Sequence, residues 1–168
     1  MALRVGDRVP DVPLTWMTDS GPAPVARDEL FGGQRVALFA VPGAFTPTCS
    51  DRHLPSVIEN AAAIRAGGID RIACLSVNDI FVMRAWAKHL GSGDGIVMLA
   101  DGAAAWTKAA GLDWDLSALG LGVRSQRYAM IVNDGRVEHI AVEQGGGFEV
   151  SSGEAMVRVL RGNRVVGA

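Results

Sequence analysis

The chain has 168 residues, a length that fits a single domain, residues 1–168, able to bury a core of its own. Its 16 Lys and Arg residues nearly balance its 18 Asp and Glu residues, and the formal net charge of -2 argues against a nucleic-acid partner or an anionic membrane surface. The apolar runs are far shorter than the roughly 18 residues that span a bilayer, so we expect no membrane segment.

Two strands, a turn and a short helix are predicted before the first cysteine. The run VALFAV at residues 36–41 is continuous and apolar, as expected of a strand buried on both faces. The pattern before it predicts a strand at residues 12–17, a turn at 19–24, and a short helix at 28–31 that ends at Gly32 and Gly33.

An amphipathic helix is predicted after Cys49. Apolar side chains recur there at steps of three and four residues, and Gly67 and Gly68 end the pattern. Pro55 lies near the start of this helix and predicts a bend, because its ring removes a backbone donor. The apolar positions are Leu54, Val57, Ile58, Ala61, Ala62 and Ile64.

The second half of the chain continues the alternation of strands and helices. Asn78 or Asp79 is expected to cap a helix that runs through Leu90, and NDGR at residues 133–136 is typical of a hairpin turn. The other predicted elements are strands at 71–77, 96–99, 128–132 and 137–142, a short helix at 103–110, and a closing helix around Met156, Val159 and Leu160. We therefore expect an α/β fold whose mixed central sheet has helices on both faces.

The chain contains two cysteines, Cys49 and Cys74. Two are too few for a disulfide framework, and their surroundings lack the close Cys and His spacing of a metal site, so we expect no metal. The first residues lack the apolar core of a secretory signal and the Ser- and Arg-rich pattern of a transit peptide, which favours a cytoplasmic protein. In a reducing compartment two thiols serve either core packing or redox chemistry.

Cys49 lies where the apolar strand gives way to a helix. Only the thiolate form of cysteine is the nucleophile, and an ordinary thiol with a pKa of about 8.5 is mostly protonated at neutral pH. A helix N-terminus favours the thiolate, and Thr46 or Thr48 is a suitable N-cap. A buried core residue is the common alternative for a free cysteine. The neighbours of Cys49 are mostly polar, which favours a reactive thiol.

The sequence PGAFTPTC at residues 42–49 resembles the P-x-x-x-T-x-x-C active-site signature of the peroxiredoxins. The following HLP, together with ACLSVND at 73–79, FVMRAW at 81–86 and LGLGVRSQRYAMIV at 119–132, resembles the type II, or fifth-class, branch of that family. The similarity covers nearly all of residues 1–160. It implies a thioredoxin-like fold and an antioxidant thiol peroxidase that reduces hydrogen peroxide and organic hydroperoxides without a metal, haem or flavin cofactor.

The resemblance assigns roles to four residues. Cys49 matches the peroxidatic cysteine, Thr46 the hydroxyl that hydrogen-bonds to thiolate and peroxide, and Pro42 the ring that shields the pocket. Arg127 matches the arginine that the family holds over the sulfur, although considered alone it would be an ordinary surface arginine. Attack of the sulfur on a peroxide leaves negative charge on the departing oxygen, so donors fixed in advance stabilise the transition state.

Four further residues are weaker candidates for the substrate pocket. His53 follows Cys49 by four residues and is placed on the same helix face, although an ordinary polar helix residue is an equally good interpretation. Phe45, Leu119 and Leu121 are placed at the walls of the pocket, and core packing explains them equally well.

After attack Cys49 becomes a sulfenic acid that must be reduced again. Cys74 follows Cys49 by 25 residues, the spacing at which plant-type members of the branch carry a second cysteine, so the resemblance suggests a resolving role. Cys74 also lies within the apolar run RIACLSV, where a buried thiol is inert and reaches Cys49 only if a segment unwinds. The resolving cysteine of animal-type members falls in GGGFEVSS, which holds no thiol.

These observations favour an external reductant, glutathione with glutaredoxin or thioredoxin, that acts directly on Cys49, with Cys74 as a minority route. The resemblance also implies a homodimer formed through a face near the active site. A thiol-based peroxide sensor that relays oxidation to a partner protein is the alternative function. A thiol-disulfide oxidoreductase is disfavoured because the sequence has no C-x-x-C pair.

Overall fold

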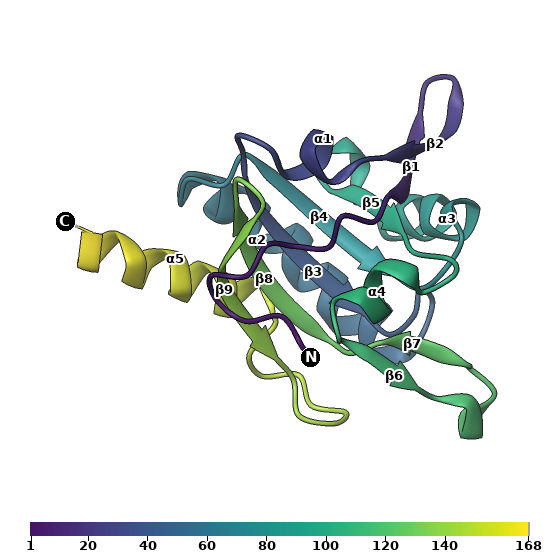
Figure 1. The fold of residues 1–168 in the computed structure, drawn as a ribbon. Coiled ribbons are helices and arrows are strands. Elements are labelled where there is room, and N and C mark those ends of the chain that lie inside the picture. The colour runs from purple at the N-terminus through teal and green to yellow at the C-terminus, as the bar shows by residue number, and fades with distance from the viewer. Residues whose placement is uncertain (168) are drawn as a thin grey trace.

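The computed structural model describes residues 1–167, and its main sheet has seven strands in the order β2-β1-β5-β4-β3-β8-β9 (Figure 1). The strands are β1 (Leu14–Thr18), β2 (Gly21–Val25), β3 (Arg35–Val41), β4 (Arg71–Ser76), β5 (Val97–Ala100), β8 (Tyr128–Asn133) and β9 (Arg136–Val142). The β3–β4 and β4–β5 pairs are parallel, and the other pairs are antiparallel. This mixed sheet confirms the predicted α/β fold.

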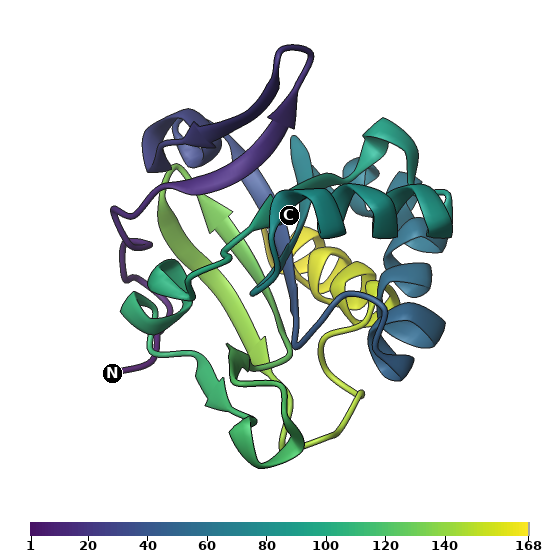
Figure 2. The same cartoon turned by 90° about the vertical axis from the view of Figure 1, so that its right-hand side faces the viewer.

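Helices cover both faces of the sheet (Figures 1 and 2). The helices are α1 (Arg27–Phe31), α2 (Leu54–Ala66), α3 (Ile80–Leu90), α4 (Ala105–Ala109) and α5 (Gly153–Gly167). Figure 2 shows α2, α3 and α5 on one face, and α1 and α4 on the other. Burial on both faces explains why β3 reads RVALFAV without polar alternation. Cys49 and Cys74 belong to the apolar cluster under α2, α3 and α5.

Local signals set several of these boundaries as predicted. Asp79 caps α3, because its Oδ1 accepts a hydrogen bond of 2.9 Å from the backbone N–H of Val82. The turn between β8 and β9 places Asp134 and Gly135 at φ values of 49° and 81°, the left-handed region that a two-residue hairpin turn requires. The hairpin therefore follows from local chemistry, and of the two predicted caps the structure uses Asp79.

Two segments differ from the predictions. The turn predicted at residues 19–24 is shorter than expected, since only residues 19 and 20 form it and residues 21–25 form β2, an edge strand that carries Pro22 and Pro24. Proline is tolerated at an edge because one side of the strand has no ladder partner for its N–H. The sequence also did not predict the second sheet, in which β6 (Asp113–Asp115) pairs with β7 (Val123–Ser125), because strands of three residues are too short to show a period.

Three short irregular helices complete the described elements. They are η1 (Cys49–His53), a π-helical turn, and the 3-10 turns η2 (Gly93–Gly95) and η3 (Ser117–Leu119). η1 lies directly before α2, so the predicted helix after Cys49 begins with a widened turn. This turn carries the candidate nucleophile.

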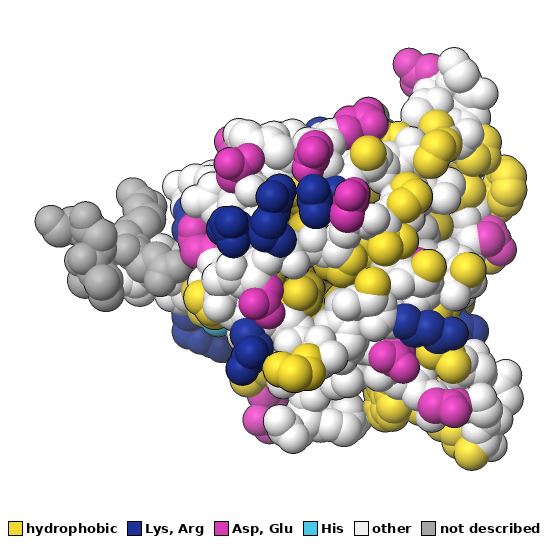
Figure 3. Space-filling model, in the orientation of Figure 1, with side chains coloured by type: hydrophobic (Ala, Val, Ile, Leu, Met, Phe, Trp, Pro, Cys, Tyr) yellow, Lys and Arg dark blue, Asp and Glu magenta, His cyan; other side chains and the backbone are white. Residues whose placement is uncertain are grey.

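Positively and negatively charged side chains lie next to one another on the face shown in Figure 3, in keeping with the nearly balanced composition. Apolar side chains also reach the surface of the same face, including the tip of the β6–β7 hairpin at the lower right, where Leu119 is exposed. Within residues 1–167, none of the helices combines the length and the apolar character that crossing a bilayer requires.

Candidate active site

The loop between β3 and the first helical turn is held by residues from two other segments. The backbone N–H of Ala44 donates a hydrogen bond of 3.0 Å to Oδ1 of Asn78. Gly43 lies so close to its neighbours that an added Cβ would be 3.0 Å from Nη1 of Arg124 and 3.1 Å from Cγ2 of Thr46. A larger residue at this position would therefore have to displace these two side chains, and Asn78, predicted only as an alternative helix cap, fixes the loop instead.

Cys49 lies in the first turn of the helical segment, as predicted from its position after β3. The backbone N–H of Ser50 donates to the carbonyl of Thr46 at 2.9 Å, which starts the helix. In the next turn the N–H of Leu54 donates to the carbonyl of Cys49, five residues earlier, and this wider spacing defines a π turn. Pro55 follows at once and has no N–H to donate, so the irregular turn and the proline lie side by side at the start of α2.

The predicted side-chain cap is not formed. The Thr48 hydroxyl makes no capping hydrogen bond, and the hydroxyl of Thr46 donates to the carbonyl of Gly43 at 2.6 Å. The helix start is instead anchored from α3, because Nε1 of the buried Trp86 donates to Oγ of Ser50 at 2.9 Å. Cys49 keeps its place near the helix N-terminus, where backbone N–H groups favour a thiolate.

The sulfur of Cys49 is fully buried and is contacted by a guanidinium from a distant part of the chain. Nη2 of Arg127, the residue before β8, donates to Sγ of Cys49 at 3.1 Å. Arg127 is itself only 7% exposed, so its positive charge acts on the sulfur with little screening by water. The pair supplies a nucleophile together with the cation that stabilises it.

His53 completes this cluster and is held neutral. Nη1 of Arg127 lies 2.8 Å from Nδ1 of His53, and Nε2 of His53 lies 2.7 Å from the carbonyl of Ser151. Because Arg127 has only donors, Nδ1 must accept and Nε2 must carry the proton. Burial and the positive charge of Arg127 lower the pKa of His53 to about 3, against the opposing effects of Ser151 and Glu143. His53 therefore acts here as a fixed acceptor that orients Arg127.

The low pKa of His53 makes the protein less stable in acid. In the unfolded chain His53 binds a proton near pH 6.5, whereas in the folded chain it stays neutral down to about pH 3, so stability falls as the pH drops through this window. We expect the native chain to lose about 2 kcal/mol more free energy of unfolding between pH 7.5 and pH 5.0 than a His53→Gln chain. Urea unfolding of both chains at the two pH values measures this difference. Equal losses would contradict it, because the other titrating groups are common to both chains.

Cys74 lies in the middle of β4, paired with Phe39 of β3 and Met98 of β5. Its side chain is fully buried, and it is a free thiol, like that of Cys49. Burial raises the pKa of Cys74 well above its ordinary value, and the charge of Cys49 raises it further. The thiol is therefore protonated and shielded from solvent in this conformation.

The remaining predicted site residues are less closely tied to the sulfur. Pro42 and Thr46 belong to the loop that precedes Cys49, and both are half-buried. The side chains of Phe45, Leu119 and Leu121 are 51%, 71% and 36% exposed, whereas the sulfur of Cys49 is fully buried. Their assignment to the pocket walls stays a prediction.

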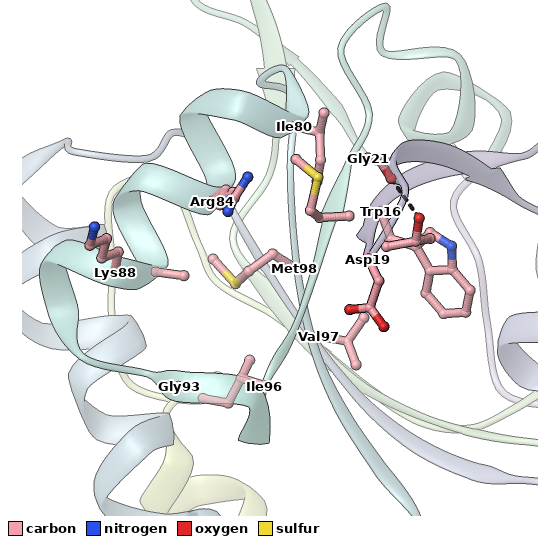
Figure 4. A pocket seen from close by; sticks show the side chains of 13 residues that line it. Trp16, Asp19, Gly21, Ile80, Arg84, Lys88, Gly93, Ile96, Val97 and Met98 are labelled. Carbon is pink, nitrogen blue, oxygen red and sulfur yellow. Dashed lines mark hydrogen bonds between the residues drawn. The ribbon is translucent and has the colours of Figure 1, made fainter.

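A surface groove of about 760 Å³ lies elsewhere, between α3 and the β1–β2 hairpin (Figure 4). Arg84 and Lys88 project from α3 along one wall, Trp16 and Asp19 lie on the opposite side, and Met98 contributes to the lining. None of the predicted site residues lines this groove in the part of the chain that the structure describes. The groove is therefore separate from the cluster of Cys49, His53 and Arg127.

Sequence reasoning missed three residues that organise the site: Asn78, Glu143 and Ser151. Asn78 holds the loop before Cys49, and the carbonyl of Ser151 holds His53. Glu143 accepts hydrogen bonds from the segment that contains Ser151. The sequence contains no motif around Glu143 and Ser151 that would have marked them. The described residues contain no group of three His, Cys, Asp or Glu side chains placed to hold a metal ion.

Comparison with known proteins places the chain in a family. The family model described as Redoxin matches residues 4–157. The chain is 49% identical over 163 residues to peroxiredoxin-2E-2, chloroplastic, of Oryza sativa subsp. japonica, covering 94% of this chain and 72% of that protein. It is 43% identical to peroxiredoxin-2B of Arabidopsis thaliana, covering 94% of this chain and 98% of the relative.

Solved structures agree with these matches. The chain superimposes on reduced Prx3 in complex with H2O2 from Vibrio vulnificus with a TM-score of 0.91 at 47% identity, covering 94% of this chain and 99% of that one. Peroxiredoxin 5 from Alvinella pompejana matches with a TM-score of 0.83 at 33% identity, covering 95% and 98%. The thioredoxin-like fold and the thiol peroxidase activity predicted from the resemblance are thus confirmed, and the chain belongs to the peroxiredoxin family.

Proposed function

We propose that this peroxiredoxin reduces hydrogen peroxide and organic hydroperoxides at Cys49 and that an external thiol, glutathione with glutaredoxin or thioredoxin, returns the sulfur to its reduced form. The observation that carries the proposal is the 3.1 Å contact between Nη2 of Arg127 and Sγ of Cys49. It joins a thiol near a helix N-terminus to a buried cation, which is the environment of a reactive cysteine.

The chemistry follows from this geometry. The Cys49 thiolate attacks the nearer oxygen of the hydroperoxide, a sulfur–oxygen bond forms, and the oxygen–oxygen bond breaks. The sulfur is oxidised by two electrons to the sulfenic acid, and the departing oxygen leaves as hydroxide or alkoxide and takes up a proton. The Arg127 guanidinium stabilises the thiolate before attack and the charge on the departing oxygen during it.

Thr46 is suited to accept a hydrogen bond from the substrate, because its own hydroxyl proton is already donated. Its hydroxyl proton is donated to the carbonyl of Gly43 at 2.6 Å, so its oxygen lone pairs are the part left to interact with a ligand. A hydroperoxide carries one O–H donor, which the Thr46 oxygen is suited to accept. This contact would orient the peroxide while the sulfur attacks.

The burial of Cys74 supports an external reductant. An internal disulfide requires the two Cα atoms to come within about 7 Å and a thiolate to attack the sulfenic acid. Cys74 is a fully buried, protonated thiol within the central β4 strand, between β3 and β5. A small thiol or an external dithiol protein avoids the cost of opening this strand.

Turnover is therefore expected to be independent of Cys74. A Cys74→Ala chain should keep its rate within about twofold of the native chain with glutathione and glutaredoxin, and with thioredoxin. Cys74→Ser serves as a second variant of nearly identical size. Consumption of cumene hydroperoxide in the presence of each reductant measures both rates. A large loss in both variants would show that Cys74 resolves the sulfenic acid, and a single turnover with every reductant would favour the peroxide sensor.

We also propose that the chain forms a homodimer. Three large apolar side chains are exposed in the active-site loop, on α3 and between β6 and β7: Phe45, Phe81 and Leu119, at 51%, 64% and 71%. Exposed apolar side chains often mark an interface. Light scattering at micromolar concentration is expected to give twice the 17.6 kDa mass of one chain, and Leu119→Asp to shift it toward one chain. A native particle with the mass of one chain would contradict the dimer.

A cytoplasmic location is proposed with this function. Cys49 and Cys74 are both free thiols, and the proposed reductants operate where thiols are kept reduced. Cell fractionation with an antibody against the chain tests the location directly.

A further inference from the structure

The buried carboxylate of Glu143 binds the segment that follows β9 through several hydrogen bonds. Oε2 of Glu143 accepts hydrogen bonds from the backbone N–H groups of Glu149, Val150 and Ser151 at 2.8 to 2.9 Å, and from Oγ of Ser151 at 2.6 Å. Glu143 is only 6% exposed. Three consecutive N–H groups that point at one oxygen form an anion-binding concavity, so the carboxylate determines where residues 149–151 lie.

This segment is part of a closed ring of hydrogen bonds around the active site. The backbone N–H of Glu143 donates to the carbonyl of Arg127 at 2.9 Å. The Glu143 carboxylate holds Ser151, whose carbonyl accepts from Nε2 of His53 at 2.7 Å. Nδ1 of His53 then accepts from Nη1 of Arg127 at 2.8 Å, which returns the ring to the residue where it began. The other guanidinium nitrogen, Nη2, is left pointing at the sulfur of Cys49.

We propose that Glu143 is a positioning residue for the peroxidase reaction, acting through Ser151 and His53 to hold the Arg127 guanidinium against the sulfur of Cys49. The proposal rests on the proposed role of Cys49 as the peroxidatic thiol. Glu143 itself touches neither the sulfur nor the site of attack; its effect depends on where it places the Ser151 carbonyl.

The ring of hydrogen bonds fixes the tautomer of His53, and this tautomer determines whether Arg127 can donate to it. With the Ser151 carbonyl in place, Nε2 carries the proton and Nδ1 is free to accept from Arg127. Without that carbonyl the other tautomer becomes accessible, and its Nδ1–H would face the N–H of Arg127, donor against donor. The guanidinium would then turn away and Nη2 would leave the sulfur, because an arginine side chain has several rotatable bonds.

Glu143 also acts on Cys49 through its charge, and this effect disfavours the thiolate, whereas the positioning of Arg127 favours it. The opposite directions of the two effects make the proposal testable. The negative charge of Glu143, acting through space alone, opposes a thiolate at Cys49, so removal of that charge would favour the thiolate. The other titratable groups around Cys49 are His53 on its own helical segment, Arg127 beside β8 and Cys74 on β4. These groups are unchanged in a variant of Glu143, so the direction of the change separates positioning from charge.

Two conservative variants distinguish length from charge. Glu143→Asp keeps the charge but withdraws the oxygens by one methylene, whereas Glu143→Gln keeps the length and one carbonyl oxygen but loses the charge. Since nearly all the hydrogen bonds fall on one oxygen, Oε2, the Gln side chain can retain most of them. Positioning therefore predicts a defect for Asp and little change for Gln. The charge acting through space alone predicts little change for Asp and a thiolate that forms more readily in Gln.

The expected results concern rate, ionisation and tautomer. In Glu143→Asp, kcat/KM for hydrogen peroxide should fall about tenfold, since small misplacements of a catalytic group have large effects, and in Glu143→Gln it should stay within about threefold. The midpoint of the pH profile for alkylation of Cys49 by iodoacetamide should rise in the Asp variant. Nitrogen-15 shifts of the His53 ring should show a single Nε2–H tautomer in the native chain and a mixture in the Asp variant.

The control variant is Glu149→Gln, which removes an exposed carboxylate from the same segment while keeping the backbone N–H that Glu143 binds. It should match the native chain in all three measurements. An Asp variant with more than half the native rate, a Gln variant as defective as the Asp variant, or a midpoint that moves to lower pH would overturn the proposal. Failure of the underlying function would appear separately, as full activity in Cys49→Ser.

Discussion

Cys49→Ser is expected to abolish turnover, with kcat/KM for hydrogen peroxide lowered at least about a thousandfold. A serine hydroxyl ionises far less readily than a thiol and cannot form a sulfenic acid. The substitution is nearly isosteric in a fully buried position, so the fold should be retained. Peroxidase assays with hydrogen peroxide and with cumene hydroperoxide, each with glutathione plus glutaredoxin, measure the loss.

Alkylation gives an independent control for this result. Iodoacetamide should inactivate the native chain in proportion to its incorporation at Cys49, and it should inactivate a Cys74→Ala chain equally well. Both thiols are buried, but Cys74 lies within the central strand β4 and its thiol is protonated, so it should not compete for the reagent. Measurable turnover in Cys49→Ser, or in a fully alkylated chain, would place the chemistry at another residue.

Arg127→Lys is expected to lower kcat/KM for hydrogen peroxide about a hundredfold, equivalent to about 3 kcal/mol in the barrier. Lysine keeps the positive charge but has one ammonium group, whereas Arg127 uses two nitrogens, Nη2 toward Cys49 and Nη1 toward His53. The lysine cannot hold both partners in this geometry. The loss should therefore reflect donor geometry and not the loss of charge.

The matched control for this prediction is Arg84→Lys, an exposed arginine on α3 that lines the groove of Figure 4. Its rate should equal that of the native chain. Single-turnover experiments add a further distinction, since Arg127→Lys should still form one sulfenic acid per chain, only slowly, while Cys49→Ser should form none. An Arg127→Lys rate within threefold of native would exclude Arg127 from the rate-determining step.

The fold was predictable wherever neighbouring residues determine the backbone. The apolar run of β3, the three- and four-residue spacing in α2 and the turn at Asp134 and Gly135 are local patterns, and each predicts its element. Local patterns failed at β2, where two prolines indicate a turn. Only the position of that segment at the edge of the sheet allows it to be a strand.

The candidate site divides in the same way. Cys49 at the start of a helix could be recognised from its surroundings, whereas Arg127 was identified only through the resemblance to peroxiredoxins. His53 had two equally good interpretations, and its contact with Arg127 favours a role in the site. Asn78 and Asp79 were both suitable caps for α3. The structure uses Asp79 as the cap and Asn78 as the clamp on the loop before Cys49.

By itself the sequence determined that a thiol lies between a buried strand and a helix, because strand, turn and helix depend on residues a few positions apart. Tertiary structure alone decided what surrounds that thiol. Arg127 is 78 positions from Cys49, and Ser151 is 98 positions from His53. The pairing of β8 with β3 and β9 brings Arg127 and Glu143 to one end of the sheet, beside the helix that carries the sulfur. Contacts over such separations arise from packing of the whole chain, and no local pattern encodes them.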